Sequence, residues 1–95
     1  MIRYISLLTF TEKGVADVGD STHRAHEFDE LAKRSGVNVE GQYWTIGSRD
    51  GVLVLSAEKE GRILHLLSEL AARGYVRTES MRAFTHSEFD AVLKA

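Results

Sequence analysis

Residues 41–55 constrain the fold most, because the second half of this stretch has no polar face. The Asp50-Gly51 dipeptide favours a hairpin, so the stretch predicts two β-strands joined by a tight turn at residues 48–51. The second strand, Val52 to Leu55, is apolar at every position. A strand of this kind is buried on both faces and needs a cover on each side. In a chain of 95 residues, this requirement indicates helices on one face and a partner subunit on the other.

The composition is that of an ordinary globular domain and excludes several classes of function. Apolar residues make up 43% of the chain and charged residues 27%, with no linker or low-complexity segment, so residues 1–95 are expected to form a single domain. The formal net charge of −2 provides no field that would attract nucleic acid or an anionic membrane. The lack of cysteine excludes disulfides, a thiolate nucleophile and cysteine-ligated zinc. Because the apolar runs are far shorter than a bilayer span, we expect a soluble cytoplasmic protein without membrane or nucleic-acid partners.

Hydrophobic periodicity and turn residues divide the chain into strands and helices. The strand-like segments are rich in β-branched and aromatic residues, whereas the helical segments repeat apolar residues every three or four positions. The expected elements are a strand at residues 2–10, a loop at 11–20 that holds one short helical turn, a helix from Ser21 or Thr22 to about Ser35, strands at 37–46 and 52–57, a helix at about 59–73, a strand at 75–83 and a short terminal helix.

The ends of the helices carry specific local signals. Gly36 and Gly74 follow the two long helices, at the position that favours a left-handed backbone. Residues 85–88 (Thr-His-Ser-Glu) form a capping box, in which the threonine hydroxyl and the glutamate carboxylate each bind a free backbone N–H. Phe84 and Phe89 stand at the hydrophobic staple positions on either side of it. These signals predict where each helix begins or ends.

The order strand-helix-strand-strand-helix-strand predicts an α+β, ferredoxin-like fold with a four-stranded antiparallel sheet. Right-handed crossovers place both main helices on one face of the sheet, so the other face is left bare. Apolar side chains at both odd and even positions cannot all point toward the helices, because strand side chains alternate between faces; they are Ile5, Leu7, Val54 and Leu55. A large exposed apolar face marks an interaction surface. We therefore expect a homodimer that packs two sheets face to face as a dimeric α/β barrel, or a higher homo-oligomer formed through the same sheet face, rather than a monomer whose apolar sheet face is exposed to solvent.

Several motifs form a pattern that extends over nearly the whole chain. They are Gly41-x-Tyr43-x-Thr45-x-Gly47-x-x-Asp50, the apolar strand after it, Val76-Arg77-Thr78-Glu79-Ser80-Met81-Arg82-Ala83-Phe84-Thr85, Thr11-x-Lys13-Gly14-Val15 and Arg24. Together they resemble the GYD-domain family. The resemblance implies a small bacterial or archaeal protein of the dimeric α/β-barrel superfamily. That superfamily includes cofactor-free monooxygenases, lactone isomerases, haem enzymes and members without catalytic activity.

Two histidines on the first long helix are the candidate catalytic residues. His23 and His26 lie three positions apart and therefore share a helix face. They can serve as a base beside a pocket or as two metal ligands. No nearby histidine, cysteine or carboxylate completes a recognisable metal spacing, so no metal site and no cofactor are predicted. The alternative, which we favour, is a pair of solvent-facing imidazoles.

The hairpin supplies the first candidate ligand-binding residues. Tyr43 and Trp44 face opposite sides of their strand, so one is expected in the helix-covered core and the other in the sheet–sheet interface. Aromatic side chains also line ligand pockets. In the turn, Arg49 replaces the tyrosine of the family's Gly-x-Tyr-Asp motif, and Asp50 is expected to shape the backbone. Turns of such barrels can also lie at the mouth of the cavity or at the dimer edge.

The last strand supplies the second candidate set. Arg77 and Glu79 share one face, whereas Arg82 shares the other with Thr78 and Ser80. A buried arginine here needs a carboxylate partner from the protein or from a ligand, which would be an anion-binding role. The alternative is an edge strand whose charges discourage aggregation. In the ferredoxin-like strand order 4-1-3-2 this strand does lie at an edge.

Three functions remain open from the residues. The first is a ligand-binding or regulatory barrel, in which the cleft between the sheet and the first long helix holds a small apolar or anionic metabolite. The second is a cofactor-independent monooxygenase or isomerase with His23 or His26 as the base. The third is a structural homo-oligomerisation module. A histidine and an arginine that converge on a cavity favour the first two, whereas a cavity filled by Tyr43, Trp44 and Phe28 favours the third.

Overall fold

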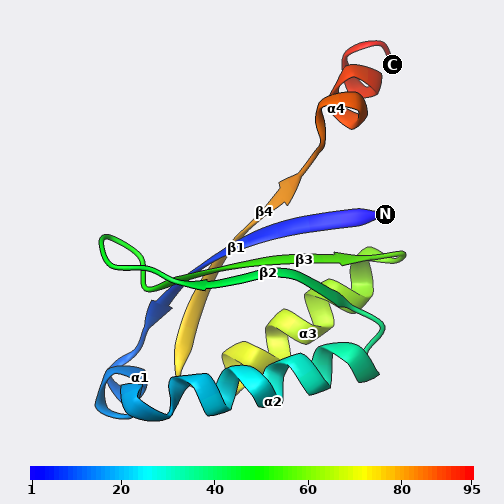
Figure 1. Ribbon diagram of the computed structural model, residues 1–95. Coiled ribbons are helices and arrows are strands. Elements are labelled where there is room, and N and C mark those ends of the chain that lie inside the picture. Colours follow the sequence, from blue (N-terminus) through cyan, green and yellow to red (C-terminus); the bar gives the residue numbers. More distant parts are fainter.

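The computed structural model describes residues 1–95 and has the predicted order of strands and long helices (Figure 1). It therefore confirms the α+β, ferredoxin-like fold. The elements are β1 (Ile2–Phe10), α1 (Glu12–Ala16), the 3₁₀ turn η1 (Val18–Asp20), α2 (Ser21–Arg34), β2 (Asn38–Trp44), β3 (Gly51–Ala57), α3 (Glu60–Ala72), β4 (Val76–Ala83) and α4 (His86–Leu93).

The four strands form one antiparallel sheet in the order β2-β3-β1-β4. β4 lies at an edge of the sheet, as predicted, and β2 forms the other edge. In Figure 1, α2 and α3 lie on the same side of the sheet, whereas α4 projects away on the opposite side. One face of the sheet is therefore covered by helices and the other is not; we call the second one the uncovered face.

The strand register determines which apolar side chains lie on each face. Leu55 of β3 is fully buried in the core beneath the helices and lies opposite Tyr4 of β1. Because alternate residues point to opposite sides, the neighbouring Ile5, Leu7 and Val54 point to the uncovered face. The predicted division of apolar residues between two faces is confirmed.

The hydrophobic core is small for the length of the chain. Only 13 of 95 residues are buried, and the Cα radius of gyration is 14.1 Å. A compact domain of this length has a radius of gyration of about 12 Å. The projecting α4 helix adds to the excess (Figure 1). The core residues are Phe28, Ala32, Val37, Leu53, Leu55, Ala57, Ile63, Leu66 and Leu67.

The segment between β1 and α2 is more helical than predicted. The Thr11 hydroxyl accepts a hydrogen bond from the Gly14 backbone N–H at 3.1 Å, which caps α1. A Cβ atom at position 14 would collide with the carbonyl oxygen of Tyr75. Glycine at this position therefore lets α1 pack directly against the backbone that leads into β4.

The helix α2 begins without the side-chain cap that was expected from Ser21 or Thr22. Asp20 occupies the N-cap position and makes no capping hydrogen bond with its side chain. The reason is that η1 runs directly into α2. Ser21 already has helical backbone angles, with φ −63° and ψ −33°, whereas a capping residue has an extended backbone.

The connection between β2 and β3 is a longer loop than the tight turn that the sequence predicts. Residues 45–50 belong to neither strand. The Thr45 N–H donates to the Asp50 carbonyl oxygen at 3.0 Å, and the Thr45 hydroxyl donates to the Arg49 carbonyl oxygen at 2.6 Å. The Asp50 N–H donates to the Leu8 carbonyl oxygen at 2.8 Å. Because β1 holds Asp50 in this way, the backbone hydrogen bond that closes the loop joins Asp50 to Thr45, five residues earlier.

The predicted helix ends are confirmed. Gly36 and Gly74 have φ angles of +73° and +82°, in the left-handed region. The capping box of α4 has both of its hydrogen bonds between Thr85 and the glutamate three residues later. The rings of Phe84 and Phe89 lie 6.1 Å apart, as a hydrophobic staple requires. None of these helices is long and apolar enough to span a bilayer.

Candidate functional site

A cleft of about 80 Å³ lies between the sheet and the N-terminal half of α2. The sequence predicts a ligand cleft at this position. Apolar side chains of β1, α2 and β3 form its floor, among them Phe10, Phe28 and Leu53. Two arginines, Arg24 and Arg73, line it as well. The cleft therefore combines an apolar interior with positive charge.

Arg24 of α2 is a largely enclosed charged group in the wall of the cleft, with 15% of its side chain exposed. Its Nη1 donates to the Asp17 carbonyl oxygen at 2.9 Å and to the Asp17 carboxylate at 2.8 Å. The guanidinium carbon lies 4.2 Å from the centre of the Tyr75 ring, which is a cation–π arrangement. These contacts hold the guanidinium in one position.

Three further residues of the family pattern, Thr11, Lys13 and Gly14, lie against Tyr75. The Thr11 N–H donates to the Tyr75 carbonyl oxygen at 3.1 Å. The Lys13 ammonium lies 4.3 Å from the centre of the Tyr75 ring. Gly14 allows the close approach of α1 described above. These three residues and Arg24 therefore all contact Tyr75. The sequence alone does not predict that they lie together.

The candidate catalytic histidines lie on the exposed surface of α2. His23 has 65% of its side chain exposed and lies 3.8 Å from the Glu27 carboxylate. His26 is exposed, as are His65 and His86. None of the four histidines lines the cleft. No group of three histidine, cysteine, aspartate or glutamate side chains is placed to hold a metal ion.

Tyr43 and Trp44 lie on opposite sides of β2, as predicted, but neither enters the core. Tyr43 is 62% exposed and Trp44 is 48% exposed. The Tyr43 ring lies on the uncovered face close to Gly41 and Val54. Both residues are nevertheless among those that line the cleft. The expected core position is wrong because the two residues end an edge strand, which has a neighbouring strand on one side only.

Asp50 shapes the β2–β3 loop, as predicted. Its Oδ2 accepts a hydrogen bond from the Phe10 N–H at 2.8 Å and so joins the loop to the end of β1. Asp50 also lines the cleft. Arg49, which stands in place of the family's tyrosine, lies outside the cleft and forms an ion pair with Glu79 of β4 at 3.1 Å. Glu79 is 30 residues from Arg49 in the sequence, so the sequence pattern did not predict this ion pair.

The charged residues of β4 lie on two faces, as predicted, and none of them lines the cleft. Arg77 is exposed and Glu79 shares its face. Arg82 points to the helix side, where its Nε lies 4.0 Å from the Glu60 carboxylate. The carboxylate partner that a partly buried arginine needs thus comes from the protein. The same carboxylate accepts a hydrogen bond from the Tyr4 hydroxyl at 2.8 Å, which raises the pKa of Tyr4, with burial adding to the effect.

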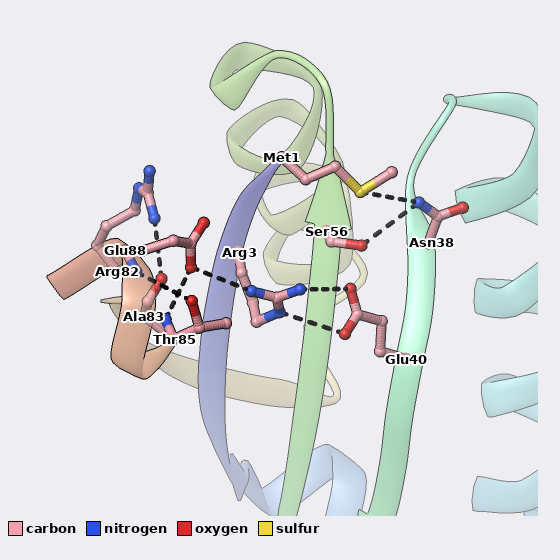
Figure 2. Close-up of polar contacts among 9 residues, drawn as sticks. All are labelled: Met1, Arg3, Asn38, Glu40, Ser56, Arg82, Ala83, Thr85 and Glu88. Carbon is pink, nitrogen blue, oxygen red and sulfur yellow. Dashed lines mark hydrogen bonds and ion pairs between the residues drawn. The ribbon is translucent and has the colours of Figure 1, made fainter. Parts of the chain in front are cut away.

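Arg3 forms a charge cluster at one end of the uncovered face (Figure 2). Its Nε and Nη2 donate to the two carboxylate oxygens of Glu40 at 3.2 and 3.5 Å, and its Nη1 donates to Glu88 at 3.5 Å. The Ser56 hydroxyl, and after it Arg3, holds the pKa of Glu40 below its usual value of 4.5. At Glu88, hydrogen bonds from the backbone and hydroxyl of Thr85 lower the pKa, with Arg3 adding to the effect. Arg3 thus links β2 to the start of α4.

The fold and these two features define a small ferredoxin-like domain with an open cleft on one side of its sheet and an uncovered face on the other. The chain belongs to the GYD domain family, whose model matches residues 4–93. It is also similar to a protein of Thermus thermophilus named glutamine synthetase and cystathionine beta-lyase binding protein. That relative is 33% identical over 95 residues, which cover 99% of this chain and 100% of the relative. The family indicated by the sequence motifs is confirmed.

Proposed function

We propose that the protein is a small homodimeric binding protein whose two copies pair through their uncovered faces as a dimeric α/β barrel. One observation carries this proposal. Leu7 lies opposite Val52, and Ile5 lies opposite Val54, so the centre of the uncovered face is a continuous apolar surface. None of these residues belongs to the core of its own chain. A contiguous apolar surface of this kind on a small domain marks a protein interface.

The size of the uncovered face suits a second copy of the chain. Four strands spaced about 4.8 Å apart, each about eight residues long at about 3.3 Å per residue, present roughly 500 Å² in projection. The relief of the side chains raises the accessible area above this projection, toward the roughly 800 Å² that each partner buries in a standard interface. A second copy brings a face of equal size and the same apolar character.

The projecting helix α4 adds to the same interface in our proposal. It lies on the side of the sheet that α2 and α3 leave open (Figure 1), and Arg3 anchors its first turn. Its apolar residues are not covered by the chain itself, since Phe89, Val92 and Leu93 are 48%, 49% and 72% exposed. A partner that covers the sheet therefore also meets this helix.

The relative's name supports a protein-binding role for the dimer. The Thermus thermophilus protein is named for binding glutamine synthetase and cystathionine beta-lyase, and it matches this chain over its full length. We propose that this dimer likewise binds a metabolic enzyme, with those two enzymes as the first to test. Purified enzyme titrated into the labelled dimer should give saturable binding, and no binding of either enzyme at micromolar concentrations would overturn this choice of partners.

The cleft between the sheet and α2 is our proposed site for a small apolar or anionic metabolite. Tyr43 and Trp44 do not fill it, because both remain exposed, and Arg24 contributes a positive charge. A histidine base, which the enzymatic alternative needs, has no counterpart among the lining residues. The binding role is therefore better supported than a monooxygenase or isomerase, and better than a purely structural module.

Two measurements test the dimer and the ligand separately. Multi-angle light scattering at micromolar concentration should give the mass of a dimer, and a monomeric mass would refute the pairing. A thermal-shift screen with aromatic acids, quinones and haem should raise the melting temperature for at least one class, because a ligand that binds the folded state stabilises it. A flat response across the screen would refute the ligand role of the cleft.

A further inference from the structure

Arg24 lines the cleft and leaves one edge of its guanidinium unused by the protein. Both hydrogen bonds of the side chain to the protein come from Nη1, and both go to Asp17. Nε and Nη2 donate to no atom of the protein, although 85% of the side chain is removed from solvent (15% is exposed). These two nitrogens form the fork that binds a carboxylate with two parallel hydrogen bonds.

Arg3 shows how the same fork is used elsewhere in this protein. Its Nε and Nη2 bind the two carboxylate oxygens of Glu40 at 3.2 and 3.5 Å (Figure 2). Arg24 has no such carboxylate within the chain. Asp50 is the acidic residue that lines the cleft, and its Oδ2 already accepts a hydrogen bond from the Phe10 N–H. The fork of Arg24 is therefore free for a carboxylate that comes from outside.

We propose that the cleft binds a small carboxylic acid with a single-ring, apolar body, and that Arg24 is the anchor of its carboxylate. This inference rests on the ligand role that we propose for the cleft. The apolar floor, with Phe10 and Phe28, accommodates the ring, and the volume of about 80 Å³ limits its size. Arg73 adds a second positive charge to the lining and makes no ion pair of its own.

The surroundings of Arg24 are suited to such an anchor because its supporting contacts are made within the chain. Asp17 and the Tyr75 ring hold the guanidinium, and Lys13 lies over the same ring. A side chain that is already in place loses little freedom on binding, which strengthens the interaction. The apolar floor also lowers the local dielectric, so that a charged hydrogen bond is stronger than in water.

Calorimetric titration with benzoate, benzamide and inorganic phosphate tests the proposal. Benzoate should bind the wild-type protein, the neutral benzamide more weakly, and phosphate, which lacks a ring, more weakly as well. Arg24→Gln should weaken benzoate binding at least about tenfold, because a charged hydrogen-bonded pair is lost. Arg34→Gln is the matched control, since Arg34 is exposed on the same helix and does not line the cleft, and it should leave binding unchanged.

The outcomes separate this inference from the proposed ligand role. Equal binding of benzoate and benzamide, unaffected by Arg24→Gln, would overturn the carboxylate anchor while the ligand role of the cleft stands. Phosphate binding as tight as that of benzoate would also overturn it, because charge alone would then suffice. No binding of any ring compound would refute both. If Arg24→Gln does not fold, as judged by circular dichroism, Arg24→Lys keeps the charge and removes the fork, and it should also weaken benzoate binding, because the two parallel hydrogen bonds are lost.

Discussion

Val54→Glu is the sharpest test of the uncovered face, because it places a charge at the centre of the proposed interface. Val54 lies opposite Ile5 and next to Gly41. It is only partly buried in the single chain, so a glutamate there can remain hydrated in the monomer. In a two-fold dimer the substitution places two carboxylates in the interface at once. The substitution should therefore weaken dimer association and have a much smaller effect on the folding stability of the single chain.

The expected size of the effect follows from the desolvation of two charges. The effective penalty for an unpaired buried ion is several kcal/mol, and a value of only about 2 kcal/mol for each copy costs the dimer about 4 kcal/mol. This free energy corresponds to a dissociation constant weakened by about 10³-fold. Sedimentation equilibrium over a series of concentrations measures that constant directly.

A matched control separates interface effects from a general effect of added charge. Leu64 lies on α3 and is 46% exposed, so Leu64→Glu makes the same type of change away from the uncovered face. We expect Leu64→Glu to associate like the wild type and Val54→Glu to be monomeric, both with native circular dichroism. Association of Val54→Glu that equals the wild type would refute pairing through this face.

Three further changes test the packing and the charges of a single chain. Gly14→Ala should lower the free energy of unfolding in urea by about 1–3 kcal/mol, because its methyl group meets backbone, whereas Gly61→Ala, with open space around it, should not. The pKa of Glu40 is lowered in the folded state, so its stabilising effect is present above its usual value of 4.5 and is lost as the pH falls through the lowered pKa. When the pH is lowered from about 6 to about 3, the free energy of unfolding should therefore fall less for Arg3→Ala than for the wild type. An equal fall in both proteins would contradict a role for the ion pair between Arg3 and Glu40. Tyr4→Phe removes the tyrosine whose pKa is raised by its hydrogen bond to Glu60, so ultraviolet titration should lose a step that lies above the usual tyrosine pKa of 10.0.

The fold was predictable because most of its signals are local. Apolar periodicity defined the strands and long helices, and the glycines at 36 and 74 and the capping box defined where helices end or begin. The errors occurred where a distant segment changes the local preference. The β2–β3 connection is a longer loop than the predicted tight turn because Asp50 is hydrogen-bonded to β1. Ser21 does not cap α2 because η1 precedes it directly and gives it helical backbone angles.

The candidate site was predictable in position but not in its residues. A ferredoxin-like sheet with two helices implies a space between α2 and the strands, and the structure has a cleft there. Chemistry and helical spacing point to His23 and His26, yet both side chains lie on the exposed side of α2. In the sequence, Arg24 stands out only as part of the family pattern. Its enclosure depends on Tyr75, which lies more than 50 residues later in the sequence.

The sequence by itself determined the order of the elements and the existence of an apolar face without a cover, because both depend on the alternation of neighbouring residues. Only the tertiary structure decided which charges meet. Arg3 finds Glu40 and Glu88 across separations of 37 and 85 residues, while the fork of Arg24 meets no carboxylate of the chain. Such ion pairs depend on the register of the sheet and the packing of the helices. The spacing of residues along the chain therefore does not predict them.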